Sequence, residues 1–205
     1  MSEPARELRE QDVDPDPLRQ FASWFEEASA AGPFLAEAAA VATASRDGAP
    51  SVRMVLVKQF DENGFVFFTN YSSRKARELD DNPRAALLFY WEGLGRQVRI
   101  DGSAERASAE DSVRYARSRA RASQLSALAS PQSRVIASRA ELERWVAELA
   151  ARYEGVELPV HESWGGFRVR PDTYEFWQQR EDRLHDRLRY AREDGGGWRI
   201  ERLAP

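Results

Sequence analysis

Three basic side chains alternate along residues 183–187, a segment for which the sequence predicts a β-strand. Alternate residues of a strand share one face, so Arg183, His185 and Arg187 are expected to point the same way. Three potential cations on one face repel each other unless an anion lies among them, and a phosphate, a carboxylate or a reduced cofactor would supply it. Histidine can also be tuned near neutral pH. The alternative is a surface strand whose charge is neutralised by its acidic neighbours, Glu181, Asp182 and Asp186.

Lysine is scarce in this chain. Lysine and arginine together number 30, and only Lys58 and Lys75 are lysines. An ammonium group is a compact point charge whereas a guanidinium is a planar fork, so the two are not interchangeable at a tight anion site. Both lysines lie in segments that could build such a site. The alternative interpretation is that both remain by chance on a solvent-exposed face and bind nothing.

The segment Ser72-Ser73-Arg74-Lys75 precedes a short helix that we expect to end at Leu79. A helix N-terminus presents free N–H groups and a positive partial charge, which suit a phosphate. Arg74 and Lys75 oppose the helix dipole there, and this cost makes sense if an anion is bound. An exposed first turn with ordinary charges is the alternative.

Other candidates need help from the fold. Arg53 and Lys58 are five residues apart and fall on opposite faces of a regular strand, so a bulge or a ligand that wraps the strand edge would have to bring them together. A lone glutamine on an apolar strand, such as Gln97, is more often structural than functional. A tryptophan in a strand, such as Trp177, is more often a core residue than a surface on which a cofactor stacks.

The elements that must position these residues are mostly short strands. Apolar runs bounded by turn signals predict eight strands, at 39–44, 51–60, 65–70, 84–91, 97–107, 166–178, 184–192 and 198–203. Capping signals predict helices that start at Asp16-Pro17, at Ser72 or Ser73, at Ser108 and at Ser138, with a loop over 120–137. Short strands with tight turns, closed by helices, favour a β-barrel with helical flanks.

Composition sets the outer limits. A length of 205 residues suits one domain, expected over 16–205 and preceded by a mobile arm over 1–15. The chain has no cysteine and no long apolar run, so a disulfide framework, a thiolate metal site and a membrane span are not expected. The net charge of −4 argues against general nucleic-acid binding, and the two histidines, His161 and His185, have no metal-ligand spacing. A cytoplasmic location fits these features.

Eight collinear segments, from about Asp16 to the last residue, resemble the pyridoxine/pyridoxamine 5′-phosphate oxidase family. They are RMVLVK (53–58), FVFFTNYSSRKARELDDNPRAALLFYW (65–91), RQVRIDGSAER (96–106), SPQS (130–133), WGGFRV (164–169), EFWQ (175–178), RLHDRLRY (183–190) and GWRIERLAP (197–205). The resemblance implies a β-rich α+β fold, the FMN-binding split β-barrel of Greek-key type with flanking helices. It also implies a homodimer with two flavin sites at the subunit interface.

The activity implied by the resemblance is oxidation of pyridoxine 5′-phosphate or pyridoxamine 5′-phosphate to pyridoxal 5′-phosphate, with O2 as the electron acceptor and H2O2 as the product. The implied FMN contacts are Arg53, Met54, Val55, Leu56, Val57, Lys58, Phe68, Thr69, Arg74, Lys75, Gln97, Gln132, Ser133, Trp177 and Arg187. Among them, Arg74 and Lys75 would hold the FMN phosphate. Arg187 or Lys58 could stabilise the reduced flavin by charge.

The substrate contacts implied by the resemblance are Lys58, Tyr115, Arg119, Ser123, Arg183 and His185. Arg183 and His185 would act as the catalytic pair, covering the pyridine ring and directing its C4′ atom toward the flavin. Tyr115, Arg119 and Ser123 are spaced at i, i+4 and i+8, so a helix would place them on one face as a phosphate clamp.

Two departures from the family pattern concern the substrate. The family's N-terminal Arg-x-x-Tyr element is missing, because the first tyrosine of the chain is Tyr71. The family's SRPxxSQxGAWxS run here is SRARASQLSALAS, with Ala120, Ser126 and Leu128 in place of proline, glycine and tryptophan. Two other functions therefore stay open: a phenazine-biosynthesis-type FMN oxidase that acts on a reduced tricyclic aromatic acid, and a non-catalytic flavin or pyridoxal-phosphate binder.

Overall fold

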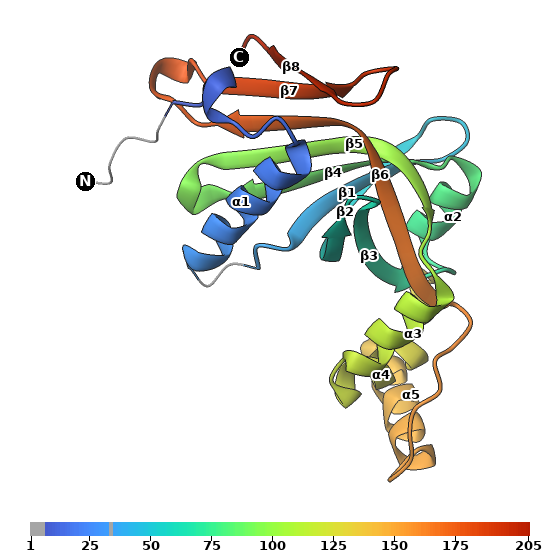
Figure 1. Cartoon of the computed structure of the whole chain (residues 1–205). Coiled ribbons are helices and arrows are strands. Elements are labelled where there is room, and N and C mark those ends of the chain that lie inside the picture. The colour runs from blue at the N-terminus through green and yellow to red at the C-terminus, as the bar shows by residue number, and fades with distance from the viewer. Residues whose placement is uncertain (1–6, 33–34) are drawn as a thin grey trace.

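The computed structural model describes residues 7–32 and 35–205, and its strands form one antiparallel sheet in the order β3-β2-β1-β4-β5-β6-β7-β8 (Figure 1). Strand β3 also pairs with β6, so β1 to β6 close into a barrel, while β7 and β8 extend the sheet beyond it. The strands are β1 (Ala38–Ala44), β2 (Pro50–Asp61), β3 (Gly64–Asn70), β4 (Arg84–Trp91), β5 (Arg96–Arg106), β6 (Trp164–Gln178), β7 (Asp186–Arg192) and β8 (Trp198–Arg202). The predicted β-barrel with flanking helices is confirmed, and strand boundaries differ from prediction by at most two residues.

The barrel interior is filled by aromatic rings, and helix α1 (Pro17–Ala30) adds one of the central ones. Phe21 of α1 is fully buried, and its ring centroid lies 4.9 Å from those of both Phe65 and Phe89. The predicted start of α1 is confirmed, because the Asp16 side chain accepts a hydrogen bond from the Leu18 amide at 2.9 Å. Burying a phenylalanine contributes about 1.5–3 kcal/mol, so α1 is fixed to the barrel mainly by its apolar face.

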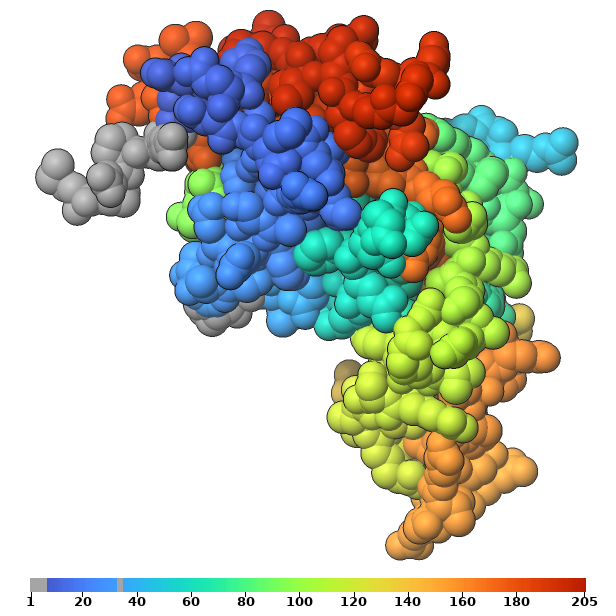
Figure 2. Space-filling view, viewed as in Figure 1, coloured from blue at the N-terminus to red at the C-terminus, as the bar shows by residue number. Residues whose placement is uncertain are grey.

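Three helices project away from the barrel in Figures 1 and 2: α3 (Ala109–Ser118), α4 (Arg121–Ala129) and α5 (Arg139–Arg152). Helix α2 (Arg74–Asp81) lies beside the strands. The predicted loop over 120–137 is wrong for residues 121–129. Ala120, the residue before α4, provides no side-chain cap, and only Leu125 of the helix is buried, so the sequence has neither a start signal nor a clear apolar stripe there.

Residues 7–15 are docked on the sheet, which differs from the mobile arm expected over 1–15; residues 1–6 lie outside the described part of the chain. Leu8 and Val13 are buried, and the Leu8 amide donates to Asp186 Oδ2 at 3.1 Å. The Tyr190 hydroxyl donates to the Asp14 carbonyl at 2.8 Å. A short 3-10 turn, Glu10–Asp12, lies between these contacts. Composition alone predicted mobility because the few apolar side chains that anchor this segment are scattered among charges.

Two further 3-10 turns complete the chain, at Glu92–Leu94 and Glu181–Arg183. Within residues 7–32 and 35–205, no helix has both the length and the apolar character required to cross a bilayer.

Candidate functional site

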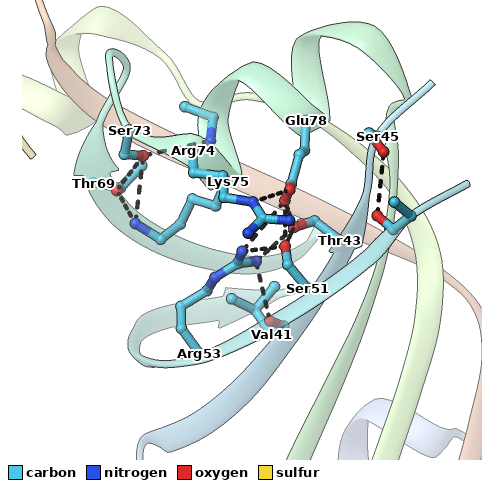
Figure 3. A network of polar contacts seen from close by, with 12 residues as sticks. Val41, Thr43, Ser45, Ser51, Arg53, Thr69, Ser73, Arg74, Lys75 and Glu78 are labelled. Atoms are coloured by element: carbon cyan, nitrogen blue, oxygen red, sulfur yellow. Dashed lines mark hydrogen bonds and ion pairs between the residues drawn. The ribbon is translucent and has the colours of Figure 1, made fainter. Parts of the chain in front are cut away.

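The N-terminus of α2 carries the expected cluster of cations (Figure 3). Ser73 caps the helix, and its Oγ accepts a hydrogen bond from the Ala76 amide at 3.4 Å. The Lys75 ammonium donates to Thr69 Oγ1 at 2.9 Å and to Gln132 Oε1 at 3.0 Å. Three residues that the resemblance assigned to the flavin therefore lie within hydrogen-bond distance of one another, although they come from β3, α2 and the segment after α4.

Lys75 is half-buried, and its hydrogen-bond partners are neutral oxygens. Burial lowers the pKa of Lys75 to about 8, and the nearby positive charge of Arg53 contributes to the same shift. A partly desolvated cation with neutral partners is stabilised when an anion approaches, because the anion supplies the missing counter-charge. This is the electrostatic character that a phosphate site needs.

A buried carboxylate, Glu78 of α2, organises the other two cations (Figure 3). Its Oε2 accepts hydrogen bonds from Thr43 Oγ1 and Ser51 Oγ, both at 2.5 Å, and lies 3.3 Å from Arg53 Nη2. Its Oε1 accepts from Arg74 Nε at 2.7 Å. Burial on its own would raise the pKa of Glu78, but these four hydrogen bonds outweigh it and lower that pKa to about 2. Glu78 is therefore ionised at neutral pH.

Strand β2 contains a bulge of the kind that would be needed to bring Arg53 and Lys58 to one site. Its pairing with β3 shifts register between Val57 and Gln59. Lys58 lies at this bulge and forms an ion pair with Glu37 at 3.0 Å. Arg53 is held instead at the Glu78 cluster, so the chain does not bring the two cations into one contact group. Between them, Met54 and Leu56 are exposed on one face of β2, while Val55 and Val57 lie on the other, inward face.

Three predicted flavin contacts form a row across β5, β6 and β7. Gln97 is paired with Trp177, and Trp177 is paired with Arg187. Residues directly opposite on antiparallel strands share a face, so the amide, the indole and the guanidinium lie side by side. Arg187 is oriented by Glu175, whose Oε1 accepts from Arg187 Nε at 2.8 Å. The row could not be derived from the sequence, since it depends on the register of three strands.

The expected alternation of Arg183, His185 and Arg187 on one strand face is wrong. Strand β7 begins at Asp186, and Arg183 ends a 3-10 turn in which Asp182 and Arg183 have φ angles of 52° and 61°. Left-handed backbone at two consecutive non-glycine residues breaks the period of two. His185 nevertheless joins the row, because its ring centroid lies 4.6 Å from that of Trp177. Arg183 is exposed.

The expected helical face that carries Tyr115, Arg119 and Ser123 is also wrong. Helix α3 ends at Ser118, Arg119 has an extended backbone with ψ of 151°, and α4 starts at Arg121. Ser123 is exposed, so the three residues do not form one stripe. At the break, the Arg119 amide donates to the Ala116 carbonyl at 3.4 Å, and the new helix begins two residues later.

Arg119 still lines a recess beside the cation cluster, and Tyr115 contacts one of the other lining residues, Phe68. A cavity of about 400 Å³ is bounded by Phe68, Thr69, Arg119 and Gln132, among other residues. Tyr115 stacks on Phe68 with ring centroids 4.2 Å apart. The Arg119 guanidinium lies over the indole ring of Trp164 at 4.6 Å. Ser133, the last assigned flavin contact, follows Gln132 in an exposed turn with φ of 72°.

Three residues of the site were not selected from the sequence. Glu78 resembled a solvated helix residue, although its spacing of four from Arg74 was a usable signal. Glu37, the partner of Lys58, lies just before β1 and carried no motif. Trp164 belongs to the WGGFRV segment but had no predicted role, and its Nε1 is buried without a hydrogen-bond partner among the described residues.

Comparisons with known proteins agree with this geometry. Residues 26–153 match the model of the pyridoxamine 5′-phosphate oxidase family, and residues 164–205 match the pyridoxine 5′-phosphate oxidase C-terminal dimerisation region. The chain is 59% identical over 198 residues to a pyridoxine/pyridoxamine 5′-phosphate oxidase of Rubrobacter xylanophilus, covering 97% of this chain and 91% of that protein. It is 51% identical over 201 residues to the protein of the same name from Salinibacter ruber, covering 97% and 94%.

Among solved structures, the fold is similar to that of PhzG from Burkholderia lata 383 in complex with tetrahydrophenazine-1-carboxylic acid. That match has a TM-score of 0.91 and 33% sequence identity, and it covers 99% of this chain and 100% of the other. The split-barrel fold expected from the sequence is thereby confirmed. The family match over most of the barrel, the curated relatives and the paired cation and aromatic groups lead to one conclusion: the chain belongs to the pyridoxamine 5′-phosphate oxidase family.

Proposed function

We propose that this chain is an FMN-dependent oxidase that converts pyridoxine 5′-phosphate or pyridoxamine 5′-phosphate to pyridoxal 5′-phosphate, with O2 as acceptor and H2O2 as product. With the amine, one water is also consumed and ammonia is released. The observation that carries the proposal is a phosphate-sized cation cluster at α2 together with a separate aromatic row at Trp177. The names of the Rubrobacter and Salinibacter relatives support the same activity. A chain without cysteine needs no oxidising compartment to fold, so we place it in the cytoplasm.

The residues present fit FMN. Arg53, Arg74 and Lys75 would hold its phosphate, and Gln97, Trp177 and Arg187 would contact its ring system. The best evidence for the fit is the half-buried Lys75 ammonium, whose partners Thr69 and Gln132 supply no negative charge. When bound, the flavin supplies the two-electron redox chemistry, and the protein supplies binding and orientation.

The cofactor site is completed by a second copy of the chain. The outer face of β1, β2 and β4 is apolar and open, with Val52, Met54 and Tyr90 exposed by 69%, 65% and 52%. Monomeric proteins rarely leave such a patch uncovered. The matched C-terminal dimerisation region supports a homodimer. In that dimer we place FMN at the interface, with its phosphate on α2 of one subunit and its ring against the Trp177 row of the other.

On the substrate side, His185 and Arg183 are the proposed catalytic pair. His185 Nδ1 accepts a hydrogen bond from the Arg180 amide at 3.1 Å, so the neutral ring carries its proton on Nε2. Nε2–H is then free to donate to the substrate's ring substituents, while the Arg183 guanidinium covers the pyridine ring. Both residues orient C4′ for hydride transfer, and neither changes its bonds in the overall reaction.

The substrate phosphate is proposed to lie near Arg119, which lines the recess beside Thr69 and Gln132. Lys58, Tyr115 and Ser123 are the remaining proposed contacts. Lys58 is paired with Glu37 and would have to exchange that carboxylate for the phosphate, whereas Ser123 is exposed and would become covered by it. A phosphate can displace a carboxylate from such an ion pair, because both are anions that accept charge-assisted hydrogen bonds.

The decisive experiment follows bleaching of the bound flavin under anaerobic conditions after pyridoxine 5′-phosphate or pyridoxamine 5′-phosphate is added. Bleaching, followed by pyridoxal 5′-phosphate and H2O2 once air is admitted, supports the proposal. Flavin that is bound stoichiometrically but stays yellow with both compounds would contradict it and would leave either an oxidase of another substrate or a non-catalytic binder.

A second candidate is oxidation of a reduced tricyclic aromatic acid. The similarity to the PhzG structure and the missing Arg-x-x-Tyr element favour it. The same anaerobic assay with a dihydrophenazine carboxylic acid separates the two candidates, because bleaching by that compound alone would select the second.

A further inference from the structure

The Glu78 carboxylate is placed where a phosphate site would not be expected to hold a negative charge. Its residue is 5% exposed, and its side chain comes from the same helix as Arg74 and Lys75. Two strand hydroxyls, Thr43 Oγ1 and Ser51 Oγ, fix one of its oxygens at 2.5 Å each. Because these donors belong to β1 and β2, the carboxylate is anchored to the barrel wall and does not depend on solvent.

Glu78 fixes one part of each arginine side chain and leaves other guanidinium nitrogens available to a ligand. Arg74 donates to Glu78 through Nε alone, at 2.7 Å, so its two terminal nitrogens remain at the exposed end of the side chain. Arg53 donates through Nη1 to Thr43 Oγ1 and through Nη2 to Ser51 Oγ and Glu78 Oε2, and the same two hydroxyls donate to Glu78. Each guanidinium therefore has one edge fixed to a rigid network, which reduces the freedom lost when a ligand binds.

The charge of the cluster is also matched to its proposed ligand. Arg53, Arg74 and Lys75 provide three cations, and Glu78 provides one carboxylate, which leaves a net charge of +2. A phosphomonoester carries a charge of about −1.5 to −2 at neutral pH. Without Glu78, three cations would face one dianion, and the charges of the cluster and its ligand would no longer match.

We propose that Glu78 is a positioning residue for the cofactor phosphate, which acts through Arg74 and Arg53 and never contacts the phosphate itself. The proposal rests on the proposed function only for the identity of the ligand, FMN. It predicts that the contribution of Glu78 is specific to a phosphorylated flavin, whereas a carboxylate that only ties α2 to the barrel would affect every flavin and the stability alike.

The test is a double-mutant cycle on FMN affinity, measured by quenching of flavin fluorescence in the flavin-free full-length protein, with riboflavin titrated in parallel. The variants are E78Q, R74A and R74A/E78Q. The matched control is D80N, which removes an acid from the same helix where it only forms a surface ion pair with Arg106 at 3.0 Å. Thermal unfolding of each flavin-free variant is recorded alongside.

We expect E78Q to weaken FMN binding roughly tenfold, the size of a lost charge-assisted interaction, and to leave riboflavin binding within twofold. In the R74A background the same substitution should have less than a threefold effect, because much of the path through which it acts is gone. D80N should bind both flavins like the parent. Tighter FMN binding by E78Q, equal losses for FMN and riboflavin, or full additivity in the cycle would each overturn the proposal.

A second variant covers the case in which E78Q does not fold. S51A keeps the carboxylate and removes one of its anchors, so it should weaken FMN binding about threefold and spare riboflavin. Unchanged FMN affinity in S51A would then contradict the positioning role. None of these measurements needs turnover, so a chain that shows the expected binding pattern and oxidises no B6 phosphate would refute the proposed activity and leave the role of Glu78 intact.

Discussion

The two ends of the candidate site are built differently. At the phosphate end, the partners of Lys75 and Glu78 lie on regular strands and on one capped helix, except for Gln132, which follows α4. At the substrate end, Arg183 comes from a 3-10 turn with left-handed backbone, and Arg119 comes from the break between two helices. A cofactor that stays bound can be held by fixed elements, whereas a substrate that enters and leaves needs residues on segments that can adjust.

The largest effect that would test this contrast is expected at Lys75. Replacing it with methionine removes a half-buried cation and keeps the side-chain shape, so FMN affinity should fall by about a hundredfold, the upper range for one charged contact. Fluorescence titration of the flavin-free protein measures it. The control is Arg77→Met on the exposed side of the same helix. A Lys75→Met protein that purifies with full FMN would show that the fixed end does not hold the cofactor.

The substrate end should respond in the opposite way. Arg183→Ala and His185→Ala are each expected to lower kcat/KM for pyridoxine 5′-phosphate by about tenfold or more, because a charged or directed contact to the ring is lost. FMN content should stay at the parental level. Steady-state kinetics and the flavin absorbance report the two quantities, and Glu181→Gln, at the start of the same turn, is the control. Loss of flavin instead of turnover would reverse the assignment of the two ends.

A pH titration can sharpen the role of Lys75. Its pKa of about 8 is below the ordinary value for lysine, and a bound phosphate would raise it again. The flavin-free protein therefore loses this proton as the pH rises through 8, and binding must then restore it. FMN affinity should be about tenfold weaker at pH 9 than at pH 7. Lys75→Arg, which stays charged, should remove this decline; a decline of the same size in that variant would assign it to another group.

The smallest effect is expected at Arg119. Its guanidinium lies over the Trp164 indole, and lysine at this position keeps the charge but loses most of that planar contact. Arg119→Lys should raise KM for the phosphorylated substrate about two- to fivefold, in line with a cation–π contribution of about 0.5–1 kcal/mol. Arg117→Lys, whose side chain pairs with Glu157 at the surface, serves as the control. An unchanged KM would place the substrate phosphate elsewhere in the recess.

The barrel was within reach of the sequence because each strand is a short apolar run between clear turn signals. Strand β4 is an example, since its observed bounds, Arg84–Trp91, coincide with the predicted ones. The cation cluster at α2 was also foreseeable, because Ser73 marks a helix start and the next two residues oppose the helix dipole. Predictions from local signals of this kind hold in the folded chain, because the contacts on which they depend are between residues close in sequence.

What the sequence did not reveal depends on distant contacts or on backbone geometry. The Gln97–Trp177–Arg187 row requires the register of three strands. The burial of Glu78 requires β1 and β2 to place hydroxyls above α2. The left-handed backbone at Asp182 is not marked by a glycine in the sequence. The alternation of Arg183 and His185 therefore predicted a strand. These three features lie at proposed functional positions, where local sequence preference is a weaker guide.

Strand β6 has a consequence for how this chain reaches its native state. It pairs with β3 on one side and with β5 on the other, and it is made about a hundred residues after β3. Until residues 164–178 leave the ribosome, both partners present open edges that could recruit other nascent chains. Barrel closure is thus a late, long-range event, so spontaneous refolding in dilute solution should be slow, and a product ending before Trp164 should aggregate.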